Sequence, residues 1–320
     1  MKVVALERMS IGEDIDLSGF EQFGEFVTYE LSTKDQIEER AKGAEVIIIN
    51  KLPINEETIA NLNELKLVVL TATGTDNVDI NYCASRGIEV RNVKGYSTSV
   101  VVQHTFASLF YVLEKLNYYD NYVKSGEYIK SPIFNHFDEK FWELDGKVWG
   151  IVGLGNIGRG VADVAKAFGC KVIYYSTSGR NSNSDYDRVE LDELLEQSDI
   201  ISIHAPLTPE TRNLFNRDLF KKMKKSAYLV NMGRGPIVNE EDLVEALNNN
   251  EIAGAALDVL CKEPMAEDNP LLKIQDSRKL LITPHIAWAS VEARQRLIDL
   301  DVENIKSYLA GGDFNLVTPK

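Results

Sequence analysis

Three side chains in the second half of the chain could carry out acid–base chemistry on a small carboxylic acid. Arg234 lies between two glycines, and Glu263 and His285 lie in loops that follow apolar, strand-like runs. A planar guanidinium suits a carboxylate, and histidine titrates where it can protonate a carbonyl oxygen. A carboxylate can orient that histidine. Taken singly, each would be an ordinary loop residue; together, and with a hydride donor, they predict reduction of a 2-keto acid.

A hydride donor is predicted by the glycines at 153, 155 and 158, which separate a strand pattern (147–152) from a helical pattern (161–168). In this context Gly153 makes the tight turn, Gly155 lets the backbone approach a pyrophosphate, and Gly158 lets the helix pack on the strand. The helix N-terminus attracts phosphate. We therefore expect a dinucleotide site here.

The choice of dinucleotide depends on the end of the next strand. About 20 residues past the glycines, an NAD enzyme usually carries an acid that binds the ribose hydroxyls. Here the chain has Ser176 and Thr177, followed by Arg180. These residues could receive a 2′-phosphate, or they could form a polar turn without preference. We expect use of both cofactors with a preference for NADPH.

The elements that must position these residues are strands alternating with helices, which indicates an α/β protein with parallel sheets. A first series of strands is expected at 2–6, 25–30, 46–50, 66–72 and 89–93, with helices at 33–41 and 56–62. A second series of six is expected at 148–152, 171–175, 199–204, 228–231, 253–259 and 280–283, a doubly wound sheet. One helix, from Ser99 to about Tyr122, crosses between the two series, and a last helix, at about 290–309, returns to the first.

Composition and charge exclude several classes of protein. The 320 residues carry a formal net charge of −14, which disfavours binding to nucleic acid or to anionic lipid. No stretch is apolar enough to span a membrane, and the N-terminus does not have the pattern of a signal peptide. Three scattered cysteines predict neither disulfides nor a metal site, so we expect a cytoplasmic protein.

Six runs make the chain resemble the D-isomer-specific 2-hydroxyacid dehydrogenase family. They follow the family's order over most of the chain: Gly74–Asp79, Gly153–Gly158, His204–Thr208, Asn231–Ile237, Ala256–Val259 and Pro284–His285. The segments Val102–Thr105 and Ser131–Phe137 most resemble the glycerate dehydrogenase (hydroxypyruvate reductase) branch. The resemblance implies a Rossmann domain, residues 99–289, inserted into a flavodoxin-like substrate domain, residues 1–98 and 290–320.

The resemblance also assigns roles to residues. It implies that Arg234 binds the substrate carboxylate and carbonyl, that His285 is the acid/base and that Glu263 supports it, while the backbone of Thr73 and Gly74 helps to hold the carboxylate. His104, His136 and His204 are not assigned to acid–base work. Further cofactor contacts are implied for Asn156, Ile157, Pro206, Thr211, Met232 and Asp258, with Asp258 near the nicotinamide amide. Two departures from the family pattern are Ser176, in place of an acid, and Ile286–Ala289, in place of small residues.

The substrate and the assembly are less constrained. Hydroxypyruvate or glyoxylate, reduced to D-glycerate or glycolate, is favoured over phosphoglycerate, a branched 2-keto acid or formate; a nucleotide-sensing corepressor is a further alternative. Phosphoglycerate enzymes often carry a C-terminal regulatory domain, and this sequence ends at Lys320. Phe134, Phe137, Phe141 and Trp142 crowd one segment. They could form a local core cluster, but the resemblance implies packing against a partner subunit, in a homodimer built mainly on the nucleotide domain.

Overall fold

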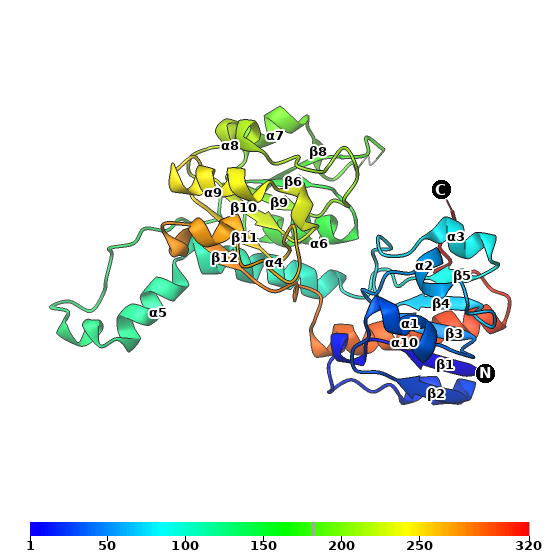
Figure 1. Cartoon of the computed structure of the whole chain (residues 1–320). Coiled ribbons are helices and arrows are strands. Elements are labelled where there is room, and N and C mark those ends of the chain that lie inside the picture. Colours follow the sequence, from blue (N-terminus) through cyan, green and yellow to red (C-terminus); the bar gives the residue numbers. More distant parts are fainter. Residues whose placement is uncertain (181–182, 320) are drawn as a thin grey trace. The chain divides into compact units, whose positions relative to one another are not determined.

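The computed structural model describes residues 1–180 and 183–319, and the chain divides into two compact units. Unit 1 comprises Met1–Ser97 together with the C-terminal residues from Ala289, and unit 2 comprises Thr98–Trp288. Each unit is built on a parallel sheet with helices (Figure 1). This confirms the predicted α/β class with two doubly wound sheets.

The sheet of unit 1 has the strand order β2-β1-β3-β4-β5. Its strands are β1 Lys2–Ala5, β2 Glu25–Thr28, β3 Val46–Ile49, β4 Leu67–Leu70 and β5 Glu89–Arg91. The central strands β3 and β4 consist only of Val, Ile and Leu and are buried along their whole length. Continuous apolar strands of this kind are typical of a parallel sheet covered on both faces.

The helices of unit 1 are short, apart from the last one. They are α1 Ile37–Arg40, α2 Glu56–Ile59, α3 Ile80–Ser85 and α10 Val291–Leu309, with 3-10 turns at Arg8–Ser10, Ser18–Phe23 and Lys34–Gln36. The helix expected at 33–41 is present as the 3-10 turn Lys34–Gln36 running directly into α1, whereas the helix expected at 56–62 is limited to α2. The hydroxyl of Ser290 caps α10 by accepting the N–H of Ala293. Ile298, Val302 and Ile305 bury the inner face of α10 against the sheet.

The sheet of unit 2 has the order β12-β11-β10-β9-β6-β7-β8. Its strands are β6 Val148–Val152, β7 Lys171–Tyr175, β8 Asp187–Arg188, β9 Ile200–Ile203, β10 Tyr228–Asn231, β11 Gly254–Leu257 and β12 Leu280–Ile282. Six were expected, and β8 is an addition that two polar, exposed residues did not reveal. The order reverses between β6 and β9, which is where a doubly wound sheet opens a crevice for ligands.

Helices cover both faces of this sheet, and each face has its own apolar core (Figure 1). The helices are α4 Thr98–Leu113, α5 Leu116–Lys124, α6 Asn156–Ala167, α7 Leu191–Gln197, α8 Arg217–Lys222 and α9 Glu240–Asn248. Shorter 3-10 turns lie at Glu127–Lys130, Gly235–Ile237, Pro270–Lys273 and Ser277–Lys279.

The prediction of one helix from Ser99 to about Tyr122 is wrong, because the chain breaks between α4 and α5. Lys115 adopts a left-handed backbone conformation, with φ of 56°, which ends the hydrogen-bonding pattern of α4. As a result, Leu113 is buried in the core of unit 2, whereas Leu116 is exposed. In Figure 1, α5 and the segment after it project from the rest of unit 2.

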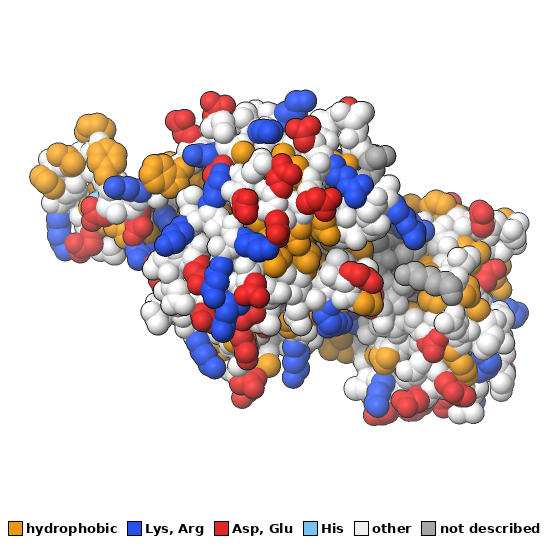
Figure 2. Space-filling view, turned by 90° about the horizontal axis from the view of Figure 1, so that it is seen from above, with side chains coloured by type: hydrophobic (Ala, Val, Ile, Leu, Met, Phe, Trp, Pro, Cys, Tyr) orange, Lys and Arg blue, Asp and Glu red, His pale blue; other side chains and the backbone are white. Residues whose placement is uncertain are grey.

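The aromatic segment after α5 is exposed rather than buried. Phe134 and Phe137 are 87% and 71% exposed, and Phe141 and Trp142 exceed 50%. Hydrophobic side chains also gather at the projecting end of unit 2 in Figure 2. The alternative of a local core cluster is therefore wrong.

Two further findings concern the chain as a whole. Among the described residues, no helix combines the length and the apolar composition needed to cross a membrane. Cys83, Cys170 and Cys261 are free thiols.

Candidate active site

The glycine turn joins β6 to α6, and it leaves no room for a side chain at two of its three glycines. Gly153 has φ of +94°, and a Cβ there would lie 2.9 Å from the backbone of Ala205. A Cβ at Gly158 would lie 2.3 Å from the carbonyl oxygen of Gly153, so only glycine lets α6 pack this closely. At Gly155 a Cβ would meet nothing within 4 Å, which leaves the backbone open to a ligand at the start of α6.

Two buried polar groups flank this turn. The hydroxyl of Ser176, at the end of β7, and both ring nitrogens of His204, at the end of β9, have no hydrogen-bond partner among the described residues. Buried polar groups are normally paired, so the unpaired groups beside this turn fit a polar ligand such as a dinucleotide. Burial lowers the pKa of His204 to about 3. The ring is therefore neutral at physiological pH, which agrees with leaving His204 out of the acid–base set.

The loop after β7 carries no carboxylate within residues 176–180. The N–H of Gly179 donates to the carbonyl oxygen of Ser176, which closes a turn, and the Arg180 side chain is exposed. The guanidinium of Arg188, on β8, donates to the carbonyl oxygen of Gly179 at 2.9 Å. Arg188 is a second cation at this loop, and the sequence analysis missed it because β8 itself was not predicted.

The other residues predicted to contact the cofactor belong to unit 2 and lie at the start of α6 and in the segments that follow β9 and β10. Asn156 and Pro206 are exposed, Ile157 is half-buried and Met232 is 8% exposed. Thr211 is buried, and its hydroxyl donates to the carbonyl oxygen of Pro206 at 2.8 Å, so it stabilises the loop after β9. Their direct contacts with a cofactor stay predictions.

The structure brings two of the three predicted catalytic residues together. His285 Nδ1 lies 2.7 Å from Glu263 Oε2, and the two side chains are 26% and 33% exposed. The other oxygen, Oε1, accepts the N–H of Leu260 at 2.9 Å, which fixes the carboxylate within its own loop. A carboxylate at Nδ1 sets the orientation of the ring and leaves Nε2 for a reacting group.

The backbone around His285 is held by Asp258, which is 2% exposed. One oxygen of Asp258 accepts the hydroxyl of Thr283 at 2.6 Å and the N–H of Ile286 at 2.9 Å. The other oxygen accepts the N–H of Ala287 at 2.8 Å. Asp258 therefore binds both sides of His285, whose φ of 56° is unusual for a residue other than glycine. A contact of Asp258 with the nicotinamide amide stays a prediction.

His104, which the sequence analysis left without a role, also contacts this loop. Its Nε2 lies 3.0 Å from the Thr283 hydroxyl. Since that hydroxyl donates its proton to Asp258, it can only accept from His104, so Nε2 carries a proton. His104 thereby extends the network from α4 to the His285 loop.

Arg234 lies in a tight turn after β10. Asn231, fully buried, shapes this turn by accepting the N–H of Gly233 and donating to the carbonyl oxygen of Arg234, both at 3.0 Å. A Cβ on Gly235 would lie 1.9 Å from the carbonyl carbon of Leu260, so this turn packs directly on the loop that carries Glu263. Asn231, too, had no predicted role.

The remaining predicted residues, Thr73 and Gly74, lie in unit 1. The Thr73 hydroxyl donates to the carbonyl oxygen of Val93 at 2.7 Å, and the Asn92 side chain donates to the carbonyl oxygen of Thr73 at 2.6 Å. These contacts order the loop after β4. The N–H of Gly74 takes part in neither of them.

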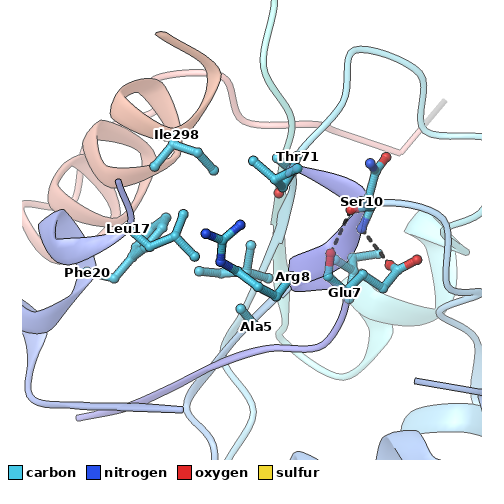
Figure 3. A pocket seen from close by; sticks show the side chains of 12 residues that line it. Ala5, Glu7, Arg8, Ser10, Leu17, Phe20, Thr71 and Ile298 are labelled. Atoms are coloured by element: carbon cyan, nitrogen blue, oxygen red, sulfur yellow. Dashed lines mark hydrogen bonds between the residues drawn. The ribbon is translucent and has the colours of Figure 1, made fainter. Parts of the chain in front are cut away.

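A neighbouring loop of unit 1 is ordered by Glu7, which follows β1 at the rim of a small cavity (Figure 3). One carboxylate oxygen accepts the successive N–H groups of Asn50, Lys51 and Leu52, at 2.7, 2.9 and 3.1 Å. Asn77 then ties this loop to the next by donating to the carbonyl oxygen of Leu52 at 2.8 Å.

Comparison with known protein families gives one matching model, the D-isomer specific 2-hydroxyacid dehydrogenase, NAD binding domain, over residues 106–287. The chain is 38% identical to a hydroxypyruvate reductase of Blautia hydrogenotrophica, with 99% of both chains covered. It is also 38% identical to a glycerate dehydrogenase of Methylorubrum extorquens, covering 99% of this chain and 98% of the relative.

A solved structure with the same fold is the NADPH-dependent glyoxylate/hydroxypyruvate reductase of Sinorhizobium meliloti, determined with NADP and malonate. Its TM-score is 0.83 at 26% sequence identity, and the alignment covers 99% of this chain and 96% of the other.

Proposed function

The chain belongs to the D-isomer-specific 2-hydroxyacid dehydrogenase family, and from this premise we propose that it reduces hydroxypyruvate and glyoxylate to D-glycerate and glycolate. Membership makes it an oxidoreductase that interconverts 2-keto acids and D-2-hydroxy acids with a nicotinamide cofactor. The choice of substrate is supported by the names of the two relatives at 38% identity, a hydroxypyruvate reductase and a glycerate dehydrogenase.

The observation that carries the mechanism is the hydrogen bond between His285 and Glu263. The Glu263 carboxylate stabilises the imidazolium, and His285 Nε2 gives its proton to the carbonyl oxygen of the keto acid. The guanidinium of Arg234 binds the substrate carboxylate and orients the carbonyl group. The nicotinamide cofactor supplies the hydride that the carbonyl carbon accepts. The backbone of Thr73 and Gly74 completes the binding of the carboxylate in this proposal.

For the cofactor, the proposal is use of both NADPH and NADH with a preference for NADPH. The loop after β7 offers hydroxyl groups and Arg180 where an acid would repel a 2′-phosphate, and Arg188 adds a second cation there. The Ser176 hydroxyl has no hydrogen-bond partner among the described residues, and the half-buried Thr177 and the exposed Arg180 follow it in the same loop. The solved reductase of S. meliloti is NADPH-dependent by its own description.

Steady-state turnover with both reduced cofactors tests the substrate. We expect hydroxypyruvate and glyoxylate to have a higher kcat/KM than pyruvate or a branched 2-keto acid, and formate not to be oxidised with NAD or NADP. A preference for a branched keto acid or for a phosphorylated substrate would reject the proposed substrate but keep the family. Cofactor binding without turnover of any of them would favour a nucleotide sensor.

The proposal includes a homodimer built on unit 2, with the cytoplasm as the compartment. Ile129 and Phe134 are 89% and 87% exposed on the segment after α5, and exposed apolar patches of this kind mark protein interfaces. Three free thiols suit a reducing compartment. Light scattering at micromolar concentration should give twice the mass of one chain, and the double variant Ile129→Asp, Phe134→Asp should give one. A single-chain mass for the wild-type protein would reject the dimer.

A further inference from the structure

Glu240, the first residue of α9, is a buried carboxylate outside the set formed by Arg234, Glu263 and His285. Only 8% of it is exposed. Burying a carboxylate is costly unless hydrogen bonds and nearby charge compensate for lost water. The start of a helix supplies part of that compensation, and two hydrogen bonds supply the rest. Oε1 accepts the N–H of Cys261 at 2.7 Å, and Oε2 accepts the side-chain amide of Asn269 at 2.9 Å.

Both donors belong to the segment between β11 and β12 that carries Glu263. The N–H of Leu260 binds Glu263 Oε1, and the next N–H, that of Cys261, binds Glu240 Oε1. Two successive peptide groups are thus each bound by a different carboxylate. At the far end, Asn269 Oδ1 accepts the N–H of Leu271 at 2.8 Å, so Glu240 reaches both ends of the loop.

The pKa of the Cys261 thiol is affected by the same carboxylate. Burial, and after it the charge and hydrogen bond of Glu240, raise the pKa of Cys261 to about 12. The raised pKa favours the neutral thiol, although Cys261 is exposed.

Glu240 also connects this segment to the turn that carries Arg234. A 3-10 turn at Gly235–Ile237 and the cap residue Asn239 lie between Arg234 and α9. The turn packs on the backbone of Leu260 at Gly235 with no room for a Cβ. The two segments thus meet at Gly235 against Leu260 and again at Glu240 against Cys261.

We propose that Glu240 is a positioning residue, which holds the Glu263 loop against the Arg234 turn and so keeps Glu263 in register with the ring of His285. The proposal rests on the proposed function, since it assigns no contact of Glu240 with a substrate. Without Glu240, the N–H of Cys261 loses its acceptor, and the peptide that precedes the Glu263 turn is free to shift. A displacement of about 1 Å in such a loop is enough to slow the chemistry greatly.

The test compares Glu240→Ala with Glu241→Ala, which removes the same charge from the next, exposed residue of the same helix. We expect Glu240→Ala to lower kcat for keto acid reduction by about 10- to 100-fold without changing cofactor affinity in a fluorescence titration. The high-pH limb of the kcat/KM profile should move to lower pH, because Glu263 stabilises the imidazolium less well. Glu241→Ala should match the wild-type protein in both measurements.

Glu240→Gln keeps an acceptor for Cys261 but turns an amide toward Asn269, so it should restore part of kcat and move the same limb less. A folded Glu240→Ala variant with an unmoved pH limb would overturn the proposal, whether or not kcat falls. If Glu240→Ala melts below the assay temperature, Glu240→Gln decides, and an unmoved limb in that variant overturns the proposal as well. Wild-type protein that turns over no keto acid would instead reject the proposed function.

Discussion

The loops after the strands of unit 1 and those after the strands of unit 2 are held in the same way, by carboxylates that accept backbone N–H groups. In unit 1, Glu7 binds three successive N–H groups of the loop after β3. In unit 2, Asp258 binds the N–H groups of Ile286 and Ala287, and Glu263 binds that of Leu260. Glu263 also hydrogen-bonds a histidine, His285, at 2.7 Å, whereas His104 Nε2 lies 3.6 Å from Asp258, beyond hydrogen-bonding distance. A carboxylate in such a loop therefore stabilises the backbone. It can also take part in catalysis when its second oxygen hydrogen-bonds a titratable side chain.

Removing the histidine that contacts Glu263 should have the largest effect on activity. His285→Ala leaves every carboxylate of unit 2 with its backbone donors but takes away the general acid, so kcat should fall by about 10²–10⁴-fold. Cofactor affinity, measured by fluorescence titration, should not change. His136→Ala, in the exposed segment after α5, is the matched control and should retain turnover. Near-normal kcat in His285→Ala would remove His285 from the mechanism.

The next largest effect concerns the cation of unit 2. Arg234→Lys keeps the charge but loses the planar pair of donors that fits a carboxylate. We expect KM for the keto acid to rise and kcat to fall, for a combined loss of about 10- to 100-fold in kcat/KM. Steady-state kinetics at saturating cofactor measure both. An unchanged KM would mean that the substrate carboxylate binds elsewhere.

A smaller effect, on the choice of cofactor, is expected at the end of β7, which has no carboxylate where an NAD enzyme usually carries one. Ser176→Asp places one at the end of β7, where it would accept the ribose hydroxyls and repel a 2′-phosphate, and the ratio of kcat/KM for NADPH over NADH should fall by about tenfold or more. Arg180→Ala should lower kcat/KM for NADPH alone. A wild-type enzyme that already prefers NADH by about a hundredfold would contradict the assigned preference.

The smallest effect concerns stability and belongs to unit 1. Burial raises the pKa of Asp301, on α10, from the ordinary 3.8 to about 8, although the side chains of Thr71 and Asn304 act in the opposite direction. Since the folded-state pKa is the higher one, the contribution of Asp301 to stability is fully present below pH 3.8 and is lost as the pH rises through about 8.

Asparagine cannot ionise, so the melting temperature of Asp301→Asn relative to wild type should rise steadily between about pH 4 and pH 9. Thermal denaturation over that range measures it, with turnover at neutral pH as a check that the fold is retained. A difference in melting temperature that does not depend on pH would show that Asp301 does not bind a proton in the folded protein.

The strands were predictable from sequence because buried parallel strands such as β3 and β4 are uninterrupted runs of Val, Ile and Leu. The break after α4 was not, since Lys115 is a common helix residue and its left-handed conformation depends on tertiary packing. β8 was missed because two polar residues leave no apolar pattern.

In the candidate site, too, some features were predictable from the sequence and others were not. The glycine turn and the pairing of His285 with Glu263 follow from motif order, because loops after adjacent parallel strands meet at one end of the sheet. The supporting residues Asn231, Glu240 and Arg188 gave no signal, because an amide, a first-turn glutamate and a surface arginine are each ordinary in the sequence. Their contacts exist only once β8, α9 and the loop after β11 are folded.

The division of unit 1 between the two ends of the chain affects how the protein is made. The apolar face of α10 completes one of the two cores around the β1–β5 sheet, and this helix follows the whole of unit 2. During translation, all of unit 2 leaves the ribosome while one side of the first sheet still lacks its covering helix. Domains fold as units as they are synthesised, so the part of the chain that is made first is the last to reach its final state. The apolar faces of β1, β3 and β4 that α10 covers stay uncovered until then.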